Sequence, residues 1–358
     1  MVSTALSRRL KLAAPVIAVG VVAAGVTVPR LADAADASAA LPPRTAAQLL
    51  EDVSQAEVEG LSGTVVATSR LGLPELPSAA GRSGGSAVSL TGLLSGSTTA
   101  RVWEAGDDRA RVAVDAPFAE YDVVRDGTDV WTFDSASADV THLVLPAGTQ
   151  QPTAPEPSGT ATPLDMAERL LSFVEPTTTV TVGRAEEVAG RAAYELVLEP
   201  KDELTLVEEV RIAVDGETSV PLRVQAFGVD QTEPAVEVAF TSVRFAVPDD
   251  SVFDFTPPSG SKVTERSLED VGADEASGAT APQPTALPQV LGEGWSTVVE
   301  TSGVQLPESA QGLFAQLSTP AKGGRAITSA LLSVLLTDDG RLLVGAVPTS
   351  KLEALAAP

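Results

Sequence analysis

Apolar and polar residues alternate along residues 98–146, which is typical of short, half-buried β-strands. The alternation breaks at Asp126-Gly127, a dipeptide that supplies the positive φ angles of a type I′ turn, so residues 121–133 are predicted to form a β-hairpin. A further strand is predicted over residues 140–145, with Leu143 and Leu145 on one face and His142 on the other.

The rest of the chain alternates between helix and strand patterns. A first helix is predicted over residues 45–59, because Thr45 and Gln48 form a capping box and Gly60 follows the last apolar position. A second helix is predicted over residues 163–174. Strands are predicted at 61–69, 191–199, 207–214, 222–227 and 236–247, with a turn at Asp215-Gly216.

Several stretches carry other patterns. Residues 70–97 are rich in Gly, Ser and Pro but contain several leucines, so they form either a lid over an apolar cavity or an insertion packed outside the sheet. Residues 147–162 are predicted to be an exposed connection, and residues 264–289 a disordered linker. In the last segment, residues 290–358, a strand is predicted at 295–299, a helix at 310–317, a hairpin at 331–347 and a helix at 350–356, capped by Ser350 with Glu353. This segment is expected to extend the main sheet at its edge.

The N-terminus has the pattern of an export signal. Arg8, Arg9 and Lys11 precede an apolar run over residues 13–28, and either Ala32-Asp33-Ala34 or Ala37-Ser38-Ala39 offers a small-x-small cleavage motif. Residues 1–34 are therefore predicted to be a signal peptide, and an uncleaved membrane anchor is the alternative.

Composition removes several classes of function. The 358 residues carry a formal net charge of −24, which argues against a nucleic-acid partner. The chain has no cysteine and one histidine, so it has neither a thiolate nucleophile nor a Cys-based or multi-His metal site. It also has no G-x-S-x-G elbow, P-loop or EF-hand loop. We therefore expect a protein that is not an enzyme and that uses no metal or cofactor.

Two ordered sets of motifs resemble a known family. The first is an arginine-bearing strand at 109–114, then Pro117, a strand at 121–125, the D-G-x-x-V-W-x-F-D motif at 126–134, and Val140-Thr141. The second has Y-x-L-x-L-x-P-K at 194–201, a D-G turn at 215–216, and F-x-F-x-P-P-x-G at 253–260. In this order the motifs resemble the LolA-type periplasmic lipoprotein carriers and the related RseB/MucB sigma-factor regulators, and the resemblance covers residues 45–263.

This resemblance implies a fold and a binding site. The implied fold is α+β but mainly β, with a strongly curved antiparallel sheet that forms an unclosed half-barrel and helices that cover its concave face. Acyl chains are expected in the apolar concavity, and an arginine on strand 109–114 is expected to hydrogen-bond the lid backbone. Arg111 fits that role best and Arg109 is the second choice. The candidate lining residues share a large apolar side chain: Trp103, Phe118, Trp131, Phe133, Leu143, Leu145, Leu171 and Phe173.

The implied functions fall into two classes. One is an exported carrier or sensor of lipid or lipoprotein acyl chains in the cell envelope. The other is a regulator of the RseB/MucB type, which binds a membrane-bound anti-sigma factor during envelope stress. A hydrolase acting on envelope material is disfavoured because the nucleophile motifs are missing.

Overall fold

The computed structural model describes residues 41–73, 95–116, 119–145, 162–163, 166–167, 177–267, 288–304, 306 and 308–357. The predicted signal peptide and most of the predicted second helix lie outside these ranges, as do most of the 70–97 insertion and of the two predicted connections at 147–162 and 264–289. Residues 163, 166 and 167 of the second helix are helical.

Most described strands belong to one 13-stranded sheet, with the order β13-β6-β5-β4-β3-β2-β1-β12-β11-β10-β9-β7 and with β8 paired to β9. Its strands are β1 (Gly60–Arg70), β2 (Ser95–Ala105), β3 (Arg109–Ala116), β4 (Ala119–Asp126), β5 (Asp129–Asp134), β6 (Asp139–Val144), β7 (Thr178–Val182), β8 (Glu186–Val188), β9 (Arg191–Pro200), β10 (Val207–Asp215), β11 (Pro221–Gly228), β12 (Val236–Arg244) and β13 (Lys262–Arg266).

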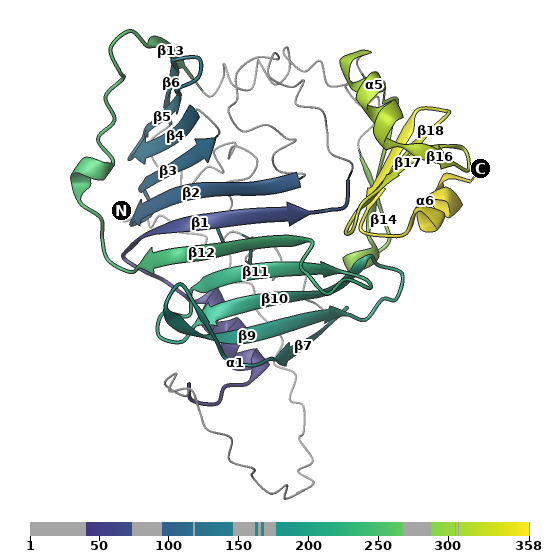
Figure 1. Ribbon diagram of the computed structural model, residues 1–358, viewed down its shortest axis with the longest axis horizontal. Coiled ribbons are helices and arrows are strands. Elements are labelled where there is room, and N and C mark those ends of the chain that lie inside the picture. Colours follow the sequence, from purple (N-terminus) through teal and green to yellow (C-terminus); the bar gives the residue numbers. More distant parts are fainter. Residues whose placement is uncertain are drawn as a thin grey trace, which may run out of the picture. The chain divides into compact units, whose positions relative to one another are not determined.

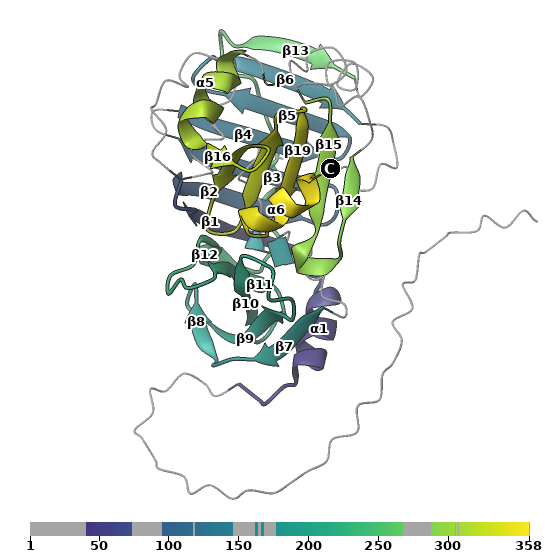
Figure 2. The same cartoon turned by 90° about the vertical axis from the view of Figure 1, so that its right-hand side faces the viewer.

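This sheet is curved and open, as Figures 1 and 2 show. The two end strands, β13 and β7, are not paired with each other. Neighbouring strands pair antiparallel, apart from β13, which runs parallel to β6. The predicted fold class, a mainly β protein built on an unclosed and strongly curved sheet, is confirmed.

The helix α1 (Ala46–Ser54) defines one side of the sheet, which we call the helix face. Leu49 and Val53 of α1 pack in one buried cluster with Leu196, Ile212 and Val224 of β9, β10 and β11. The helix lies beside β7 in both views (Figures 1 and 2). Packing apolar side chains between a helix and a sheet is the main source of stability for both.

The opposite side, which we call the strap face, is crossed by residues 245–260, the strap. The strap includes the short helix η1 (Asp250–Val252) and joins β12 to β13 along the outside of the sheet (left in Figure 1). Because β13 continues from the strap and pairs with β6, the first residues of the predicted 264–289 linker are part of a strand instead.

Two local predictions about turns and caps need correction, and one is confirmed. The Thr45–Gln48 capping box is present, but α1 ends at Ser54 and Gly60 begins β1. The predicted Asp126-Gly127 turn is centred on Gly127-Thr128, because Asp126 pairs with Asp129. Only Gly127 has a positive φ, of 62°, as in a type II′ turn; type I′ would need a second positive φ at Thr128.

The last described residues form a separate six-stranded sheet, with the order β14-β15-β19-β18-β17-β16. The expectation that this segment extends the main sheet is therefore wrong. Its elements are β14 (Gln289–Leu291), η2 (Gly294–Ser296), β15 (Val298–Ser302), α5 (Glu308–Leu317), β16 (Thr319–Ala321), β17 (Gly324–Thr328), β18 (Ser333–Thr337), β19 (Arg341–Gly345) and α6 (Thr349–Ala356).

The N-cap of the last helix, α6, also differs from the predicted one. The N-cap of α6 is Pro348, which makes no side-chain cap bond, so Ser350 lies inside the helix. The Glu353 side chain instead accepts a hydrogen bond from the Lys322 backbone N–H, at 2.8 Å.

Candidate functional site

The helix face is apolar across β1 to β6, beyond the strands that α1 covers. Residues that pair across antiparallel strands point to the same side of the sheet, so the register assigns each residue to a face. One row runs from Val65 through Ala100 and Val114 to Tyr121, and further rows lie beside it. The apolar members of these rows on β1 to β6 are Leu61, Val65, Ala100, Val102, Ala110, Val112, Val114, Val123, Val130 and Leu143.

These side chains are not all equally covered. Val65, Val102 and Val114 are almost fully buried, whereas Val112 and Leu143 keep part of their surface exposed. Together they form a continuous apolar surface on the helix face, which we call the apolar half-sheet.

Polar side chains interrupt the apolar half-sheet at several points. Glu104 and Arg125 lie in the row of Leu61, Ala110, Val130 and Leu143, and Thr132 and Thr141 continue the row of Val112 and Val123. Tyr121 of β4 pairs directly with Asp134 of β5, and both point to the helix face. Burial raises the pKa of the Tyr121 phenol; a hydrogen bond with Thr132 lowers it and the nearby Asp134 carboxylate raises it further. The Asp134 carboxylate accepts a hydrogen bond from the Ala136 backbone N–H at 2.8 Å, so it also holds the β5–β6 turn.

The strap face carries the aromatic residues of β5. The rings of Trp131 and Phe133 lie 5.5 and 6.3 Å from the ring of Phe255, which belongs to the strap. Phe253 of the strap is 2% exposed. The F-x-F motif at 253–255 thus packs the strap against the sheet, although the sequence analysis used it only as a family motif.

Two arginines of β3 hold the strap. Arg111 makes a two-point ion pair with the buried Asp122, at 2.9 and 3.2 Å, and donates a further hydrogen bond to the Val252 carbonyl at 3.2 Å. Arg109 forms an ion pair with Asp250 and lies over the Phe253 ring. Both arginines therefore contact the strap, on the strap face, and the expected contact with a lid stays a prediction.

The structure does not bring all the candidate lining residues to one surface. Trp131 pairs with His142 and Val130 pairs with Leu143, so Trp131 and Leu143 point to opposite sides of the sheet. Trp103, Trp131 and Phe133 share the strap face, whereas Leu143 lies on the helix face. Leu145 follows the end of β6 and is buried. Phe118, Leu171 and Phe173 lie outside the described residues.

The sequence analysis did not include the valines that β2, β3 and β4 contribute to the apolar half-sheet, which are Val102, Val112, Val114 and Val123. The alternation of Arg109, Arg111 and Ala113 with Ala110, Val112 and Val114 was the available signal. The predicted lining consists of large aromatic and leucine side chains instead, although several small aliphatic side chains cover a strand surface as well as one ring does.

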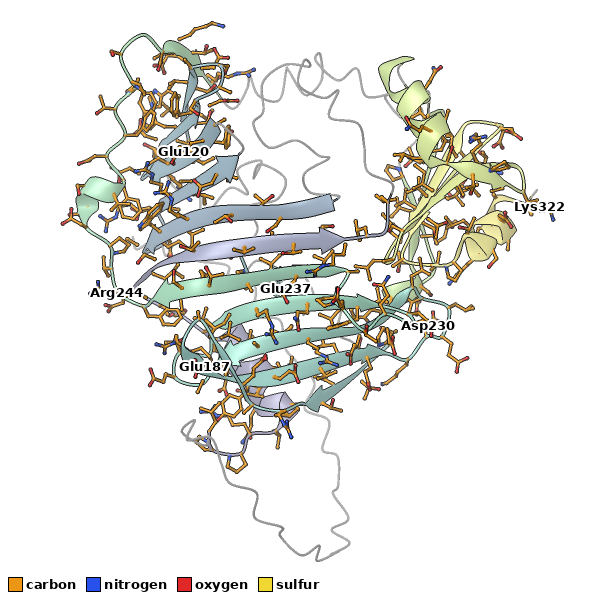
Figure 3. The ribbon with its side chains drawn as sticks, in the orientation of Figure 1. Glu120, Glu187, Asp230, Glu237, Arg244 and Lys322 are labelled. Carbon is orange, nitrogen blue, oxygen red and sulfur yellow. The ribbon has the colours of Figure 1, made fainter. Side chains whose placement is uncertain are left out.

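No group of three or more His, Asp or Glu side chains is arranged to hold a metal ion within the described ranges. The acidic side chains are spread over separate elements, as the labelled Glu120, Glu187, Asp230 and Glu237 illustrate (Figure 3). Among the helices that the model describes, none is long and apolar enough to span a bilayer.

Comparison with family models and with curated proteins gives no match. Similar solved structures include a chain of the Pseudomonas aeruginosa MucA/MucB complex, with 17% identity, a TM-score of 0.43, and coverage of 87% of this chain and 96% of that one. LprF from Mycobacterium bovis has 12% identity and a TM-score of 0.31, with 61% and 97% covered. A LolA superfamily protein from Nitrosomonas europaea has 11% identity and a TM-score of 0.23, with 60% and 99% covered.

Proposed function

We propose that this protein is an exported, non-enzymatic protein of the cell envelope that binds acyl chains of lipids or lipoproteins, as a carrier or a sensor. The observation that carries the proposal is the apolar half-sheet on the helix face of β1 to β6. Its aliphatic side chains form a broad surface, which Glu104, Arg125 and the Tyr121–Asp134 pair interrupt, and the sheet that bears it is curved and open.

Such a surface suits a ligand that needs no directional partner. Burying an acyl chain contributes about 0.8 kcal/mol for each CH₂ group removed from water. A chain of several methylenes therefore binds firmly to an aliphatic surface alone. The lining residues that we propose are Leu143, from the sequence analysis, and the valines Val65, Val102, Val112, Val114 and Val123.

A fluorescent fatty acid such as cis-parinaric acid tests this proposal. We expect saturable binding to the mature chain, and a loss of at least about tenfold in affinity for Leu143→Asp, because the ligand would then meet a charge in an apolar site. Val112→Thr keeps the side-chain shape and adds a hydroxyl, so it is expected to weaken binding while the fold is retained.

Ser242→Asp is the matched control. Ser242 is exposed on β12 and pairs with Thr64, which places it on the strap face. The Ser242→Asp substitution adds to this sheet the same charge as Leu143→Asp does, and we expect it to leave fatty-acid binding unchanged. Equal binding by wild type, Leu143→Asp and Ser242→Asp would reject the apolar half-sheet as the site.

A second candidate function is regulation through an anti-sigma factor, and the six-stranded sheet favours it. The regulators that the motifs resemble carry a second module after the half-barrel, and here a separate sheet follows the main one. One of its faces is covered by α6, through Leu352 and Ala356. On the other face one row of apolar residues crosses five of its strands: Val290, Val299, Val344, Val334 and Ile327.

This row offers an apolar surface for a protein segment. Val290 is 68% exposed and Val299 is 39% exposed. Under the regulator hypothesis, Val299→Asp is expected to abolish binding of the extracytoplasmic part of an anti-sigma factor from the same organism, measured by calorimetry, and to leave fatty-acid binding intact. Retained binding by this variant would reject the surface as the regulator's interface.

A further inference from the structure

The only histidine of the chain lies between two carboxylates at an edge of the main sheet. His142 Nδ1 lies 2.7 Å from Glu265 Oε2, and His142 Nε2 lies 2.8 Å from Asp129 Oδ1. The ring also stacks on Trp131, with 3.8 Å between centroids and 8° between planes. The His142 side chain is only 14% exposed, so these contacts fix its position.

The two distances indicate which form of the ring the structure holds. An ionised carboxylate only accepts hydrogen bonds, and a neutral imidazole carries one N–H and one bare nitrogen. With ionised carboxylates at hydrogen-bond distance from both nitrogens, a proton on each nitrogen lets both contacts be hydrogen bonds. The arrangement therefore favours the imidazolium cation, which bridges two anions.

The two anions come from different parts of the chain. Asp129 begins β5, next to β6, whereas Glu265 belongs to β13, which reaches this edge only through the strap. The contact between His142 Nδ1 and Glu265 thus ties the side chains of β6 to those of β13. We propose that β13 is an edge strand latched by the charged form of His142, and that raising the pH loosens it.

The other nearby charges leave this assignment in place. Lys262 and Arg266 of β13 alternate with Glu265 and so point to the opposite face of the strand. Asp126 of β4 pairs with Asp129, and Arg109 of β3 pairs with Asp126 in the same row. Asp254 of the strap is exposed, next to Phe255. Within the part of the chain that the structure describes, the cation paired with Asp129 and with Glu265 is the His142 ring.

Loss of the ring proton affects one contact more than the other. The neutral ring can keep a single donor, so one carboxylate oxygen then faces a nitrogen lone pair. Glu265 is 70% exposed and Asp129 is 48% exposed, and Glu265 is attached to an edge strand with one neighbour. Its contact is the one we expect to open, while β13 keeps its backbone pairing with β6.

Hydrogen exchange of the β13 amides as a function of pH, corrected for intrinsic exchange, tests the latch on the full mature chain. Because the chain has a single histidine, the ring resonances report its charge without ambiguity. We expect the protection of β13 to fall by about threefold to tenfold as His142 loses its proton, with the same midpoint for both signals. A titrating ring with unchanged β13 protection would overturn the proposal.

Two variants separate the latch from a general effect of pH. In Glu265→Gln the new amide can donate a hydrogen bond to the Nδ1 atom of a neutral His142. The β13 amides are therefore expected to stay protected at high pH, so the fall in protection with rising pH, which we call the step, is expected to disappear or invert. In Asp139→Asn, which changes the residue paired with Lys262, the step is expected to remain. A step that persists unchanged in Glu265→Gln, or that is lost in Asp139→Asn, would contradict the latch.

Discussion

Gly63 lies on β1 where a side chain has no room. A Cβ there would lie 2.5 Å from the Ser242 carbonyl oxygen and 2.9 Å from the Phe240 ring. Gly63→Ala is therefore expected to destabilise the fold by about 1–3 kcal/mol in urea unfolding, because backbone must move to make space. Gly312 of α5 is the matched position, since nothing lies within 4 Å of its added Cβ. There Gly→Ala is expected to stabilise by up to about 1 kcal/mol, and equal effects at the two glycines would contradict this account.

Asp215 is a buried carboxylate, 1% exposed, that organises the turn after β10. Burial raises its pKa, but hydrogen bonds from Arg191 and from Thr218 outweigh that effect and lower the pKa below its ordinary value. The sequence analysis expected a simple Asp215-Gly216 turn. Instead, the Asp215 side chain accepts bonds from the Glu217 and Thr218 backbone N–H groups, at 3.1 and 2.8 Å, and closes a longer loop.

Asp215→Ala is expected to cost about 3–5 kcal/mol at pH 7, because it leaves Arg191 without its buried partner. Since the folded pKa is lowered, Asp215 stabilises the protein above its unfolded pKa, and this contribution is lost as the pH falls through the folded pKa. Unfolding measured from pH 7 downward should thus show a shallower acid decline in the variant. The control is Glu217→Gln, which also bonds Arg191 but is 83% exposed and is expected to change stability by less than about 1 kcal/mol. Equal losses in the two variants would contradict the role of burial.

At the scale of elements, the strap is held to the sheet by a few residues. Arg111→Ala removes the bond to the Val252 carbonyl and leaves the buried Asp122 without its cation. We expect a loss of about 3 kcal/mol in stability and faster proteolysis within residues 245–260. Arg101→Ala, which removes an exposed pair with Glu120, is the control and should leave the strap protected. Strap cleavage at the wild-type rate in Arg111→Ala would show that the arginine does not hold it.

Elements were predicted well where the pattern is local. Most strands of the main sheet follow from alternation, but β7, β8 and β13 do not, and α1 follows from a capping box that the structure contains. The turn after Asp126 was assigned to the wrong type because the strand pairing, not the dipeptide, decides which two residues are central. Similarly, Trp131 and Leu143 were grouped as lining residues because single strands show alternation but not the register between strands.

At the scale of the whole molecule, the fold could be predicted only in part. The curved open sheet was expected from two ordered sets of motifs, and it is present. The six-stranded sheet was not expected, because β15 pairs with β19 across about forty residues and no local pattern marks such a pairing. The apolar half-sheet likewise exists only once six strands are aligned, so no single segment of the sequence displays it.

The central claim is that the helix face of β1 to β6 holds an acyl chain. Native mass spectrometry with lipid extraction, on the chain from Ala35 onward purified from a bacterial host, tests it most directly. We predict a stoichiometric acyl-bearing species that is lost in Leu143→Asp and retained in Ser242→Asp, with both variants folded by circular dichroism. A wild-type protein that is empty and takes up no added fatty acid, or an acyl species that persists in Leu143→Asp, would contradict the account.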